Sequence, residues 1–258
     1  MKSILNFIVI VTALLFSQAC TSESSSDADT SNTTLSGSYA TLLTINNRLY
    51  VVNKTEITTY DITNAKKPAL LDKKDIGIDI ESLYHYDNLL LIGSANNMYI
   101  YELNSNGIPL FKSNSSYTDI FDINGCSSDP IVVKNQIAYV TLSTTISGRC
   151  GWRNVNELRV YDIVDPVHPI LLDTIGMSNP KGLAIGDNYL YICDGVTGLQ
   201  VFSLDNPQEP QRFKSFSGFT AYDCILKGNL LLVVCQEELR QYDVSDPNNI
   251  TLLSQIDL

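Results

Sequence analysis

Residues 161–172 read Tyr161-Asp-Ile-Val-Asp-Pro-Val-His-Pro-Ile-Leu-Leu, and this stretch decides the fold because the chain repeats it. Related stretches begin at Tyr60, Tyr101, Phe202 and Tyr242, so the aromatic residues are separated by 41, 60, 41 and 40 residues. A period near 40 residues, built from strand patterns alone, is typical of the blades of a β-propeller. We therefore predict an all-β fold with about five four-stranded blades.

The fourth copy shows most clearly how one blade is built. Alternating apolar residues predict strands at 182–185, 189–193, 199–204 and 211–216, with turn residues between them. Pro207 and Pro210 stand outside these strands, where a missing N–H group does no harm. The same pattern predicts strands at 39–45, 49–53, 57–62 and 69–73 in the first copy, at 80–86, 89–93, 98–103 and 109–113 in the second, and at 221–226, 230–234, 239–244 and 251–257 in the last.

The first nineteen residues are typical of a secretory signal peptide. Lys2 supplies a positive charge, and a mostly apolar run from Ile4 to Phe16 is too short for a stable membrane span. The following Ser17-Gln-Ala-Cys20 resembles a bacterial lipoprotein signal, although Ser17 stands where leucine is usual. The resemblance implies that Cys20 carries a lipid. The alternative is ordinary cleavage near Ala19 with release of the product.

Residues 20–37 form a predicted flexible linker, since they are rich in serine and acidic residues and contain no aromatic residue. A serine- and acid-rich run after a lipidated cysteine also resembles the export signal of surface lipoproteins in Bacteroidetes-type bacteria, but a plain spacer would look similar. We expect a lipid-anchored protein of the bacterial cell envelope, at the outer membrane or cell surface.

Residues 38–258 are long enough for one large all-β domain. Without the signal peptide, 16 basic residues face 28 acidic ones, which gives a net charge of −12. Such a surface repels phosphate backbones, so nucleic acid is excluded as an expected partner.

Two copies best carry a third strand like Leu-x-Val-x-Asp that is followed by Asp-Pro. They are Leu158-Arg-Val-Tyr-Asp-Ile-Val-Asp-Pro-Val-His-Pro169 and Leu239-Arg-Gln-Tyr-Asp-Val-Ser-Asp-Pro247. The pattern resembles the LVIVD repeat family of bacterial propeller proteins over nearly the whole of residues 38–258. The fourth copy departs from it at Ser203, and the second copy has Glu102 and lacks Asp-Pro. The resemblance implies a secreted or surface-attached protein and transfers no catalytic residue.

The third copy holds about 19 residues more than its neighbours. The surplus lies at 116–129, before its first strand, and at 143–156, between its second and third strands. Antiparallel strand order puts these two connections at the same end of a blade. Cys126 lies in one segment and Cys150 in the other, and an exported protein favours a disulfide between them over two thiols or a metal site. For Cys193, Cys224 and Cys235, a second bridge and buried thiols both remain open.

The second surplus segment contains the only tryptophan, Trp152, flanked by Arg149 and Arg153. These residue types often anchor binding interfaces. The alternative is that Trp152 only covers the top of the blade core while the arginines pair with acidic residues. A long loop on a rigid scaffold favours this end as the functional face.

Candidate residues for catalysis are few, because the chain has only His85 and His168. We expect His168 in a solvated turn and His85 in a strand near the channel. A Ca²⁺ site at the channel mouth is physically reasonable, although carboxylates that are simply solvated are the more common case. Its candidate ligands are Asp79, Glu81, Asp119, Asp122 and Asp223.

The favoured interpretation is therefore a non-enzymatic binding scaffold for a protein or glycan, without a resident cofactor. One alternative is a Ca²⁺-dependent hydrolase or lyase acting at the channel mouth. Another is a structural module of an envelope assembly.

Overall fold

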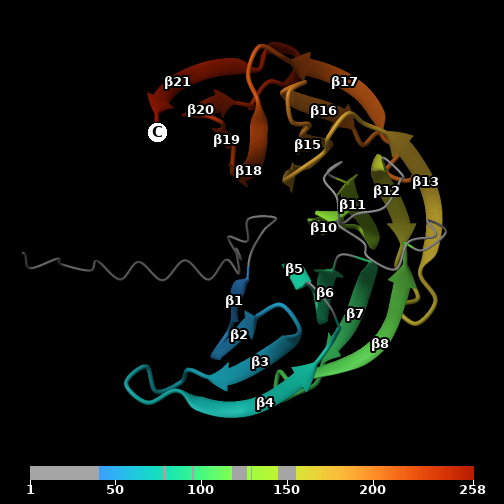
Figure 1. Ribbon diagram of the computed structural model, residues 1–258, viewed down its shortest axis with the longest axis vertical. Helices are drawn as coiled ribbons and strands as arrows, with labels where there is room; N and C mark the ends of the chain where they lie inside the picture. Colours follow the sequence, from blue (N-terminus) through green and yellow to red (C-terminus); the bar gives the residue numbers. More distant parts are fainter. Residues whose placement is uncertain (1–40, 78–79, 95, 118–126, 129, 145–154) are drawn as a thin grey trace, which may run out of the picture. The chain divides into compact units, whose positions relative to one another are not determined.

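The computed structural model describes residues 41–77, 80–94, 96–117, 127–128, 130–144 and 155–258 (Figure 1). By its contacts the chain divides into two units, residues 1–33 and 34–258, and all described residues belong to the second. Within the described ranges, no helix has the length and apolar character needed to cross a membrane.

The described residues form five antiparallel sheets, each of which follows the chain from one edge strand to the other (Figure 1). Blade 1 consists of β1 (Leu42–Ile45), β2 (Arg48–Val52), β3 (Glu56–Asp61) and β4 (Ala69–Asp75). Blade 2 consists of β5 (Ile80–Tyr86), β6 (Leu89–Ser94), β7 (Asn97–Leu103) and β8 (Pro109–Ser116). Blade 3 consists of β10 (Ile131–Lys134), β11 (Ile137–Thr144), β12 (Asn156–Asp162) and β13 (Ile170–Gly176), with the short β9 (Ser127–Ser128) added.

Blades 4 and 5 repeat the same order. Blade 4 consists of β14 (Leu183–Ile185), β15 (Tyr189–Cys193), β16 (Leu199–Ser203) and β17 (Gln211–Phe216). Blade 5 consists of β18 (Ala221–Lys227), β19 (Leu230–Cys235), β20 (Glu238–Asp243) and β21 (Thr251–Asp257), with one 3₁₀ turn, η1 (Pro247–Asn249). The fold is all-β with five four-stranded sheets, as expected for a five-bladed β-propeller. The expected strands are confirmed within a few residues at each end.

The Tyr-Asp motif ends the third strand of a blade and starts the turn that follows. Asp162 accepts a hydrogen bond from the Val164 N–H at 2.8 Å, and Asp165 accepts one from the Val167 N–H at 2.9 Å. Such bonds let a side chain replace a backbone partner in a tight turn. The second of these bonds recurs in all five blades, and its acceptors are Asn64, Asn104, Asp165, Asn206 and Asp246. The repeated motif is therefore a repeated turn.

The aromatic residue that opens each repeat has a fixed place in its blade. In every blade the register between the third and fourth strands shifts at this residue. In blades 2 to 5 it is buried against the preceding blade; these residues are Tyr101, Tyr161, Phe202 and Tyr242. Tyr60 of blade 1 is only half-buried.

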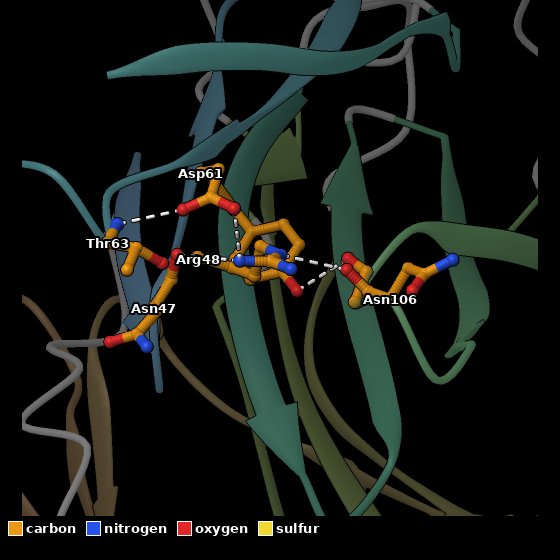
Figure 2. A network of polar contacts seen from close by, with 7 residues as sticks. Asn47, Arg48, Asp61, Thr63 and Asn106 are labelled. Atoms are coloured by element: carbon orange, nitrogen blue, oxygen red, sulfur yellow. Dashed lines mark hydrogen bonds and ion pairs between the residues drawn. The ribbon is translucent and has the colours of Figure 1, made fainter. Parts of the chain in front are cut away.

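The described residues form four apolar core clusters, one at each junction between successive blades. Hydrogen bonds to the next blade's turn accompany these clusters. At the first junction the Tyr50 hydroxyl donates to Gly107 O at 2.7 Å. Arg48 Nε donates to Asn106 O at 2.8 Å, and the Arg48 guanidinium also lies 3.0 Å from Asp61 (Figure 2). At the third junction Tyr139 donates to Pro207 O at 2.8 Å. Each blade is thus completed by its neighbour.

Candidate functional site

The two surplus segments of blade 3 have their bases side by side. The short strand β9 follows the first segment, and it pairs antiparallel with the end of β11, from which the second segment leaves. Ser143 lies opposite Ser128, and Thr144 lies opposite Ser127. The structure therefore places the described end of the first segment and the described start of the second at the same end of blade 3.

The residues expected to act at this end lie outside the described residues. These are Cys126 and Cys150 of the expected disulfide and the expected binding residues Arg149, Trp152 and Arg153. Cys20, the expected lipidation site, also lies outside them. The disulfide, the binding residues and the lipid anchor stay predictions.

Buried hydroxyl groups join the base of the second segment to blade 4. Thr141 Oγ1 donates to Lys181 O at 2.7 Å, and Ser143 Oγ forms a hydrogen bond with Asn179 Oδ1. Both hydroxyl side chains are buried, so water does not compete with these bonds. The end of β11 is thereby fixed to the connection that precedes β14.

Asp194 holds the same connection from the blade 4 side. Its buried carboxylate accepts hydrogen bonds from the Ser178 N–H at 3.0 Å, the Asn179 N–H at 2.8 Å and the Thr197 hydroxyl at 2.7 Å. Charge-assisted bonds of this kind are stronger than neutral ones. Sequence reasoning treated Asp194 as ordinary loop. The signal in the sequence was weak: an acidic residue that directly follows the hydrophobic strand Tyr189–Cys193.

Arg159 supports the point where the first surplus segment begins. Its Nε atom donates to Glu157 Oε1 at 2.6 Å, and its guanidinium carbon lies 5.7 Å from the ring centre of Tyr117. Burial alone would lower the pKa of Arg159, but hydrogen bonds with Tyr161 and Glu157 raise it, so the guanidinium stays charged. The arrangement recurs in blade 5. There Arg240 Nε lies 2.6 Å from Glu238 Oε1, and the Arg240 guanidinium carbon lies 4.0 Å from the ring centre of Phe219. The recurrence marks it as part of the scaffold.

The acidic residues proposed for Ca²⁺ are only partly described. Asp79, Asp119 and Asp122 lie outside the described residues. Glu81 lies at an irregularity of β5 in blade 2, and Asp223 lies beside one in β18 of blade 5. Among the described residues, no group of three or more His, Cys, Asp or Glu side chains is placed to hold a metal ion.

Asp223 has a structural role at the junction of blades 4 and 5. Its Oδ1 atom accepts a hydrogen bond from the Cys224 N–H at 2.9 Å. A Cβ atom on Gly182 would lie 1.8 Å from the same oxygen, so the carboxylate fits only because residue 182 is glycine. The glycine thus permits the close approach of β18 to blade 4.

The two histidines lie in different blades. His85 is half-buried in β5, and burial lowers its pKa. His168 is exposed in the turn after β12, where its Nδ1 atom lies 2.8 Å from Asp165 Oδ2. This contact and the Val167 N–H lower the pKa of Asp165. Among the hydrogen bonds of the described residues, none joins a histidine to a serine or cysteine side chain.

The three remaining cysteines are buried thiols without a disulfide. They share the apolar cluster between blades 4 and 5, which contains Cys193, Cys224 and Cys235. The Cys224 thiol donates weakly to Tyr191 O at 3.6 Å, and burial raises the pKa of Cys193 well above its usual range. Of the two possibilities left open by the sequence, the structure shows buried thiols.

Neither the known family profiles nor the sequences of curated proteins match this chain. Solved structures do resemble it. A functionally unknown protein from Desulfotomaculum acetoxidans superimposes with a TM-score of 0.64 at 9% identity, over 81% of this chain and 66% of that one. A protein from Lactobacillus plantarum gives a TM-score of 0.61 at 12% identity, over 83% of this chain and 69% of the other.

The periplasmic gluconolactonase of Pseudomonas aeruginosa is similar to the same degree. Its TM-score is 0.61 at 14% identity, over 82% of this chain and 69% of that one. The chain therefore spans about two thirds of the length of these structures. At such low identity the likeness supports the propeller fold alone.

Proposed function

We propose that this protein is a non-enzymatic binding scaffold that recognises a protein or glycan through the insertion end of blade 3. The observation that carries the proposal is the pairing of β9 with β11, which joins the bases of two long segments found in no other blade. Regular blades serve as a rigid support, and loops on such supports are the usual place of recognition.

The base beneath the segments is built to stay rigid. Buried hydrogen bonds tie β11 to blade 4, and Arg159 fixes Tyr117 where the first segment begins. A rigid base lowers the ordering cost of binding, because less conformational freedom is lost when a ligand arrives. Trp152 and its neighbouring arginines, Arg149 and Arg153, are the proposed contact residues, and a Cys126–Cys150 disulfide would join the two segments.

The proposal includes a place in the cell. We infer that residues 1–19 are a signal peptide, that Cys20 carries a lipid, and that residues 20–37 tether an LVIVD-like propeller to the envelope. The acidic balance of the chain supports a protein or glycan partner over nucleic acid.

The experiment compares the full chain with a triple variant, Arg149→Ala, Trp152→Ala and Arg153→Ala. Both are applied to a glycan microarray and to immobilised, detergent-extracted envelope proteins. We expect the variant to lose retention and to keep the wild-type circular dichroism and melting temperature. A matched control, Val164→Ala with His168→Ala, alters the turn at the opposite end of the same blade and should retain wild-type binding. Wild-type binding by a folded triple variant would exclude this location.

Calcium calorimetry separates the proposal from metal-dependent catalysis. A Ca²⁺-induced rise in melting temperature that disappears in Glu81→Gln and Asp223→Asn would favour a Ca²⁺ site and the enzyme alternative. If Ca²⁺ gives the wild type and these variants the same binding heat and the same change in melting temperature, these two carboxylates hold no Ca²⁺ and the binding scaffold stays the favoured function.

A further inference from the structure

The connection between β15 and β16 of blade 4 presents an apolar side chain to solvent. It consists of residues 194–198, and its tip, Val196, is 73% exposed. The described residues of the equivalent connections in blades 1, 2 and 5 are all polar; they are Asn53, Lys54, Thr55, Asn96, Gln236 and Glu237. Val196 therefore departs from the pattern of the other blades, and it does so in a blade that adjoins the insertion.

Hydrogen bonds hold the 194–198 connection in one conformation. The Asp194 N–H donates to Gly198 O at 2.7 Å, and the Gly198 N–H donates to Gly195 O at 3.0 Å. The Thr197 hydroxyl donates to the buried Asp194 carboxylate at 2.7 Å. Gly195 and Gly198 have φ angles of 57° and 81°, which glycine adopts without strain. Because these bonds fix the backbone on both sides of it, the valine at the tip is held rigidly.

A second exposed side chain lies close to this tip in the fold. Ala221, at the start of β18, pairs with Gly195 in an antiparallel bridge, and its N–H donates to Gly195 O at 2.9 Å. The next residue, Tyr222, is 40% exposed and lies at the register irregularity of β18, a feature that often re-aims a side chain. The Tyr222 backbone oxygen accepts a hydrogen bond from the Gly182 N–H of blade 4 at 2.9 Å. Tyr222 is therefore fixed to the same blade that carries Val196, and we call the two residues the apolar pair.

The apolar pair shares its support with the base of the second surplus segment. A Cβ atom on Gly195 would lie 3.1 Å from Asn179 Cβ, so this connection touches Asn179 directly. Asn179 Oδ1 is in turn hydrogen-bonded to Ser143 Oγ, near the end of β11 from which the second surplus segment leaves. Asn179 thus stands between the Val196 connection and the base of the insertion, and the two belong to one continuous surface.

We propose that the ligand of the insertion end is a folded protein and that Val196 and Tyr222 are contact residues for it. The inference rests on the proposed function, and it chooses between protein and glycan. Tyr222 suits either ligand, so Val196 decides. An oligosaccharide presents hydroxyl groups and has no apolar pocket to receive a protruding valine. Folded proteins offer such pockets, and a side chain that is rigid before binding loses little freedom on entering one.

Retention of the full chain on immobilised, detergent-extracted envelope proteins tests the ligand class. One part of the extract is left untreated, one is oxidised with mild periodate, which cleaves sugar diols, and one is denatured by heat. We expect retention on the untreated and the oxidised extract and loss of retention on the denatured extract. Retention that survives heat and is lost after periodate would identify a glycan and overturn the inference. Any other pattern also contradicts a folded protein as the ligand.

Substitutions in the apolar pair test the place of contact. Val196→Asp should weaken retention about tenfold or more, because it puts a carboxylate into an apolar interface. Val196→Ser, which adds no charge, and Tyr222→Ala should weaken it less. All three variants should keep the wild-type circular dichroism, since both side chains are exposed in the free chain. Thr55→Asp puts the same charge on the equivalent exposed connection of blade 1, and this matched control should bind as the wild type does.

The variants separate this inference from the proposed function on which it rests. If the triple variant of the insertion loses retention while Val196→Asp and Tyr222→Ala keep it, the insertion alone carries the binding and the inference is wrong. If the wild type itself is not retained on any extract, the proposed function and the inference fall together.

Discussion

Blades 3 and 5 are built from nearly the same third strand, and they differ in what surrounds it. Both contain Glu-Leu-Arg-x-Tyr-Asp, and in both the arginine lies 2.6 Å from the glutamate and over an aromatic ring. Blade 3 has a neighbour on each side and carries two surplus segments, whereas blade 5 has one described neighbour and joins β19 to β20 through Gln236 and Glu237 alone. The shared residues therefore belong to the scaffold, and the surplus segments are the feature that distinguishes blade 3 from the other blades.

The largest expected effect comes from removing the aromatic residue of each repeat. Tyr161→Ala should lower the free energy of unfolding by about 3 to 5 kcal/mol, because it leaves a cavity between two packed blades. Tyr242→Ala should cost less, since the open face of blade 5 lets the sheet relax toward the cavity. Urea unfolding monitored by circular dichroism measures both. Equal costs would show that the outer face of blade 5 is as constrained as an internal one.

An exchange of one residue sharpens the contrast between internal and outer faces. Val160 is fully buried at the junction of blades 3 and 4, and Gln241 is its half-buried equivalent in blade 5. Val160→Gln should cost about 2 to 3 kcal/mol, because it buries an amide without a partner. Gln241→Val should change stability by about 0.5 kcal/mol or less. Chemical unfolding of both variants checks the pair, and a large loss of stability in Gln241→Val would contradict the assignment of an outer face.

The arginines give the next smaller effect. Arg159→Met should cost about 2 kcal/mol, because Glu157 loses its charged partner in a mostly buried setting. Arg240→Met should cost about 1 kcal/mol, since the Arg240 side chain is more exposed and solvent screens its interaction with Glu238. Thermal unfolding of both variants provides the measurement. If Arg240→Met proved the more damaging, exposure would not control the strength of this pair.

The smallest expected effect concerns pH and the turn after the shared strand. His168 in blade 3 stands where blade 5 has Asn249, and its contact helps to lower the pKa of Asp165. A lowered folded-state pKa gives stability that is present above the unfolded-state pKa and is lost as pH falls through the folded-state value. His168→Asn should therefore raise the pKa of Asp165 toward its usual value. An NMR titration of the Asp165 carboxyl carbon reports it, with the Asp243 carboxyl, which lies in another blade, as the unchanged reference.

Much of the fold could be predicted from the sequence because its signals are local. Alternating apolar residues gave the strands of blade 4 almost to the residue, and the Asp and Asn residues of the repeat gave the turns. The short strand β9 was not predicted, since two residues carry no measurable periodicity. Its partner on β11 is distant in sequence and visible only in the fold.

The supporting residues of the candidate site were missed for the same reason. Asp194 draws its importance from backbone N–H groups of Ser178 and Asn179, which belong to another connection. Arg159 was hidden within a repeat that suggested uniform scaffold, and its contact with Tyr117 spans 42 positions of the chain. The 60-residue spacing, by contrast, was a local count, and it located the end of the blade where the surplus lies.

The measurement that tests the account most directly gives blade 3 the connection that blade 5 has. Residues 145–154 are replaced by Gln-Glu, the connection of blade 5, so that Thr144 and Val155 face each other across a two-residue turn. The shortened chain and the wild type are compared on the glycan microarray and the immobilised envelope proteins, and by thermal unfolding. We predict an unchanged fold with a similar melting temperature, since shortening a loop costs little, and a complete loss of retention. A folded, shortened chain that binds as the wild type does would contradict the claim that the insertion carries the function.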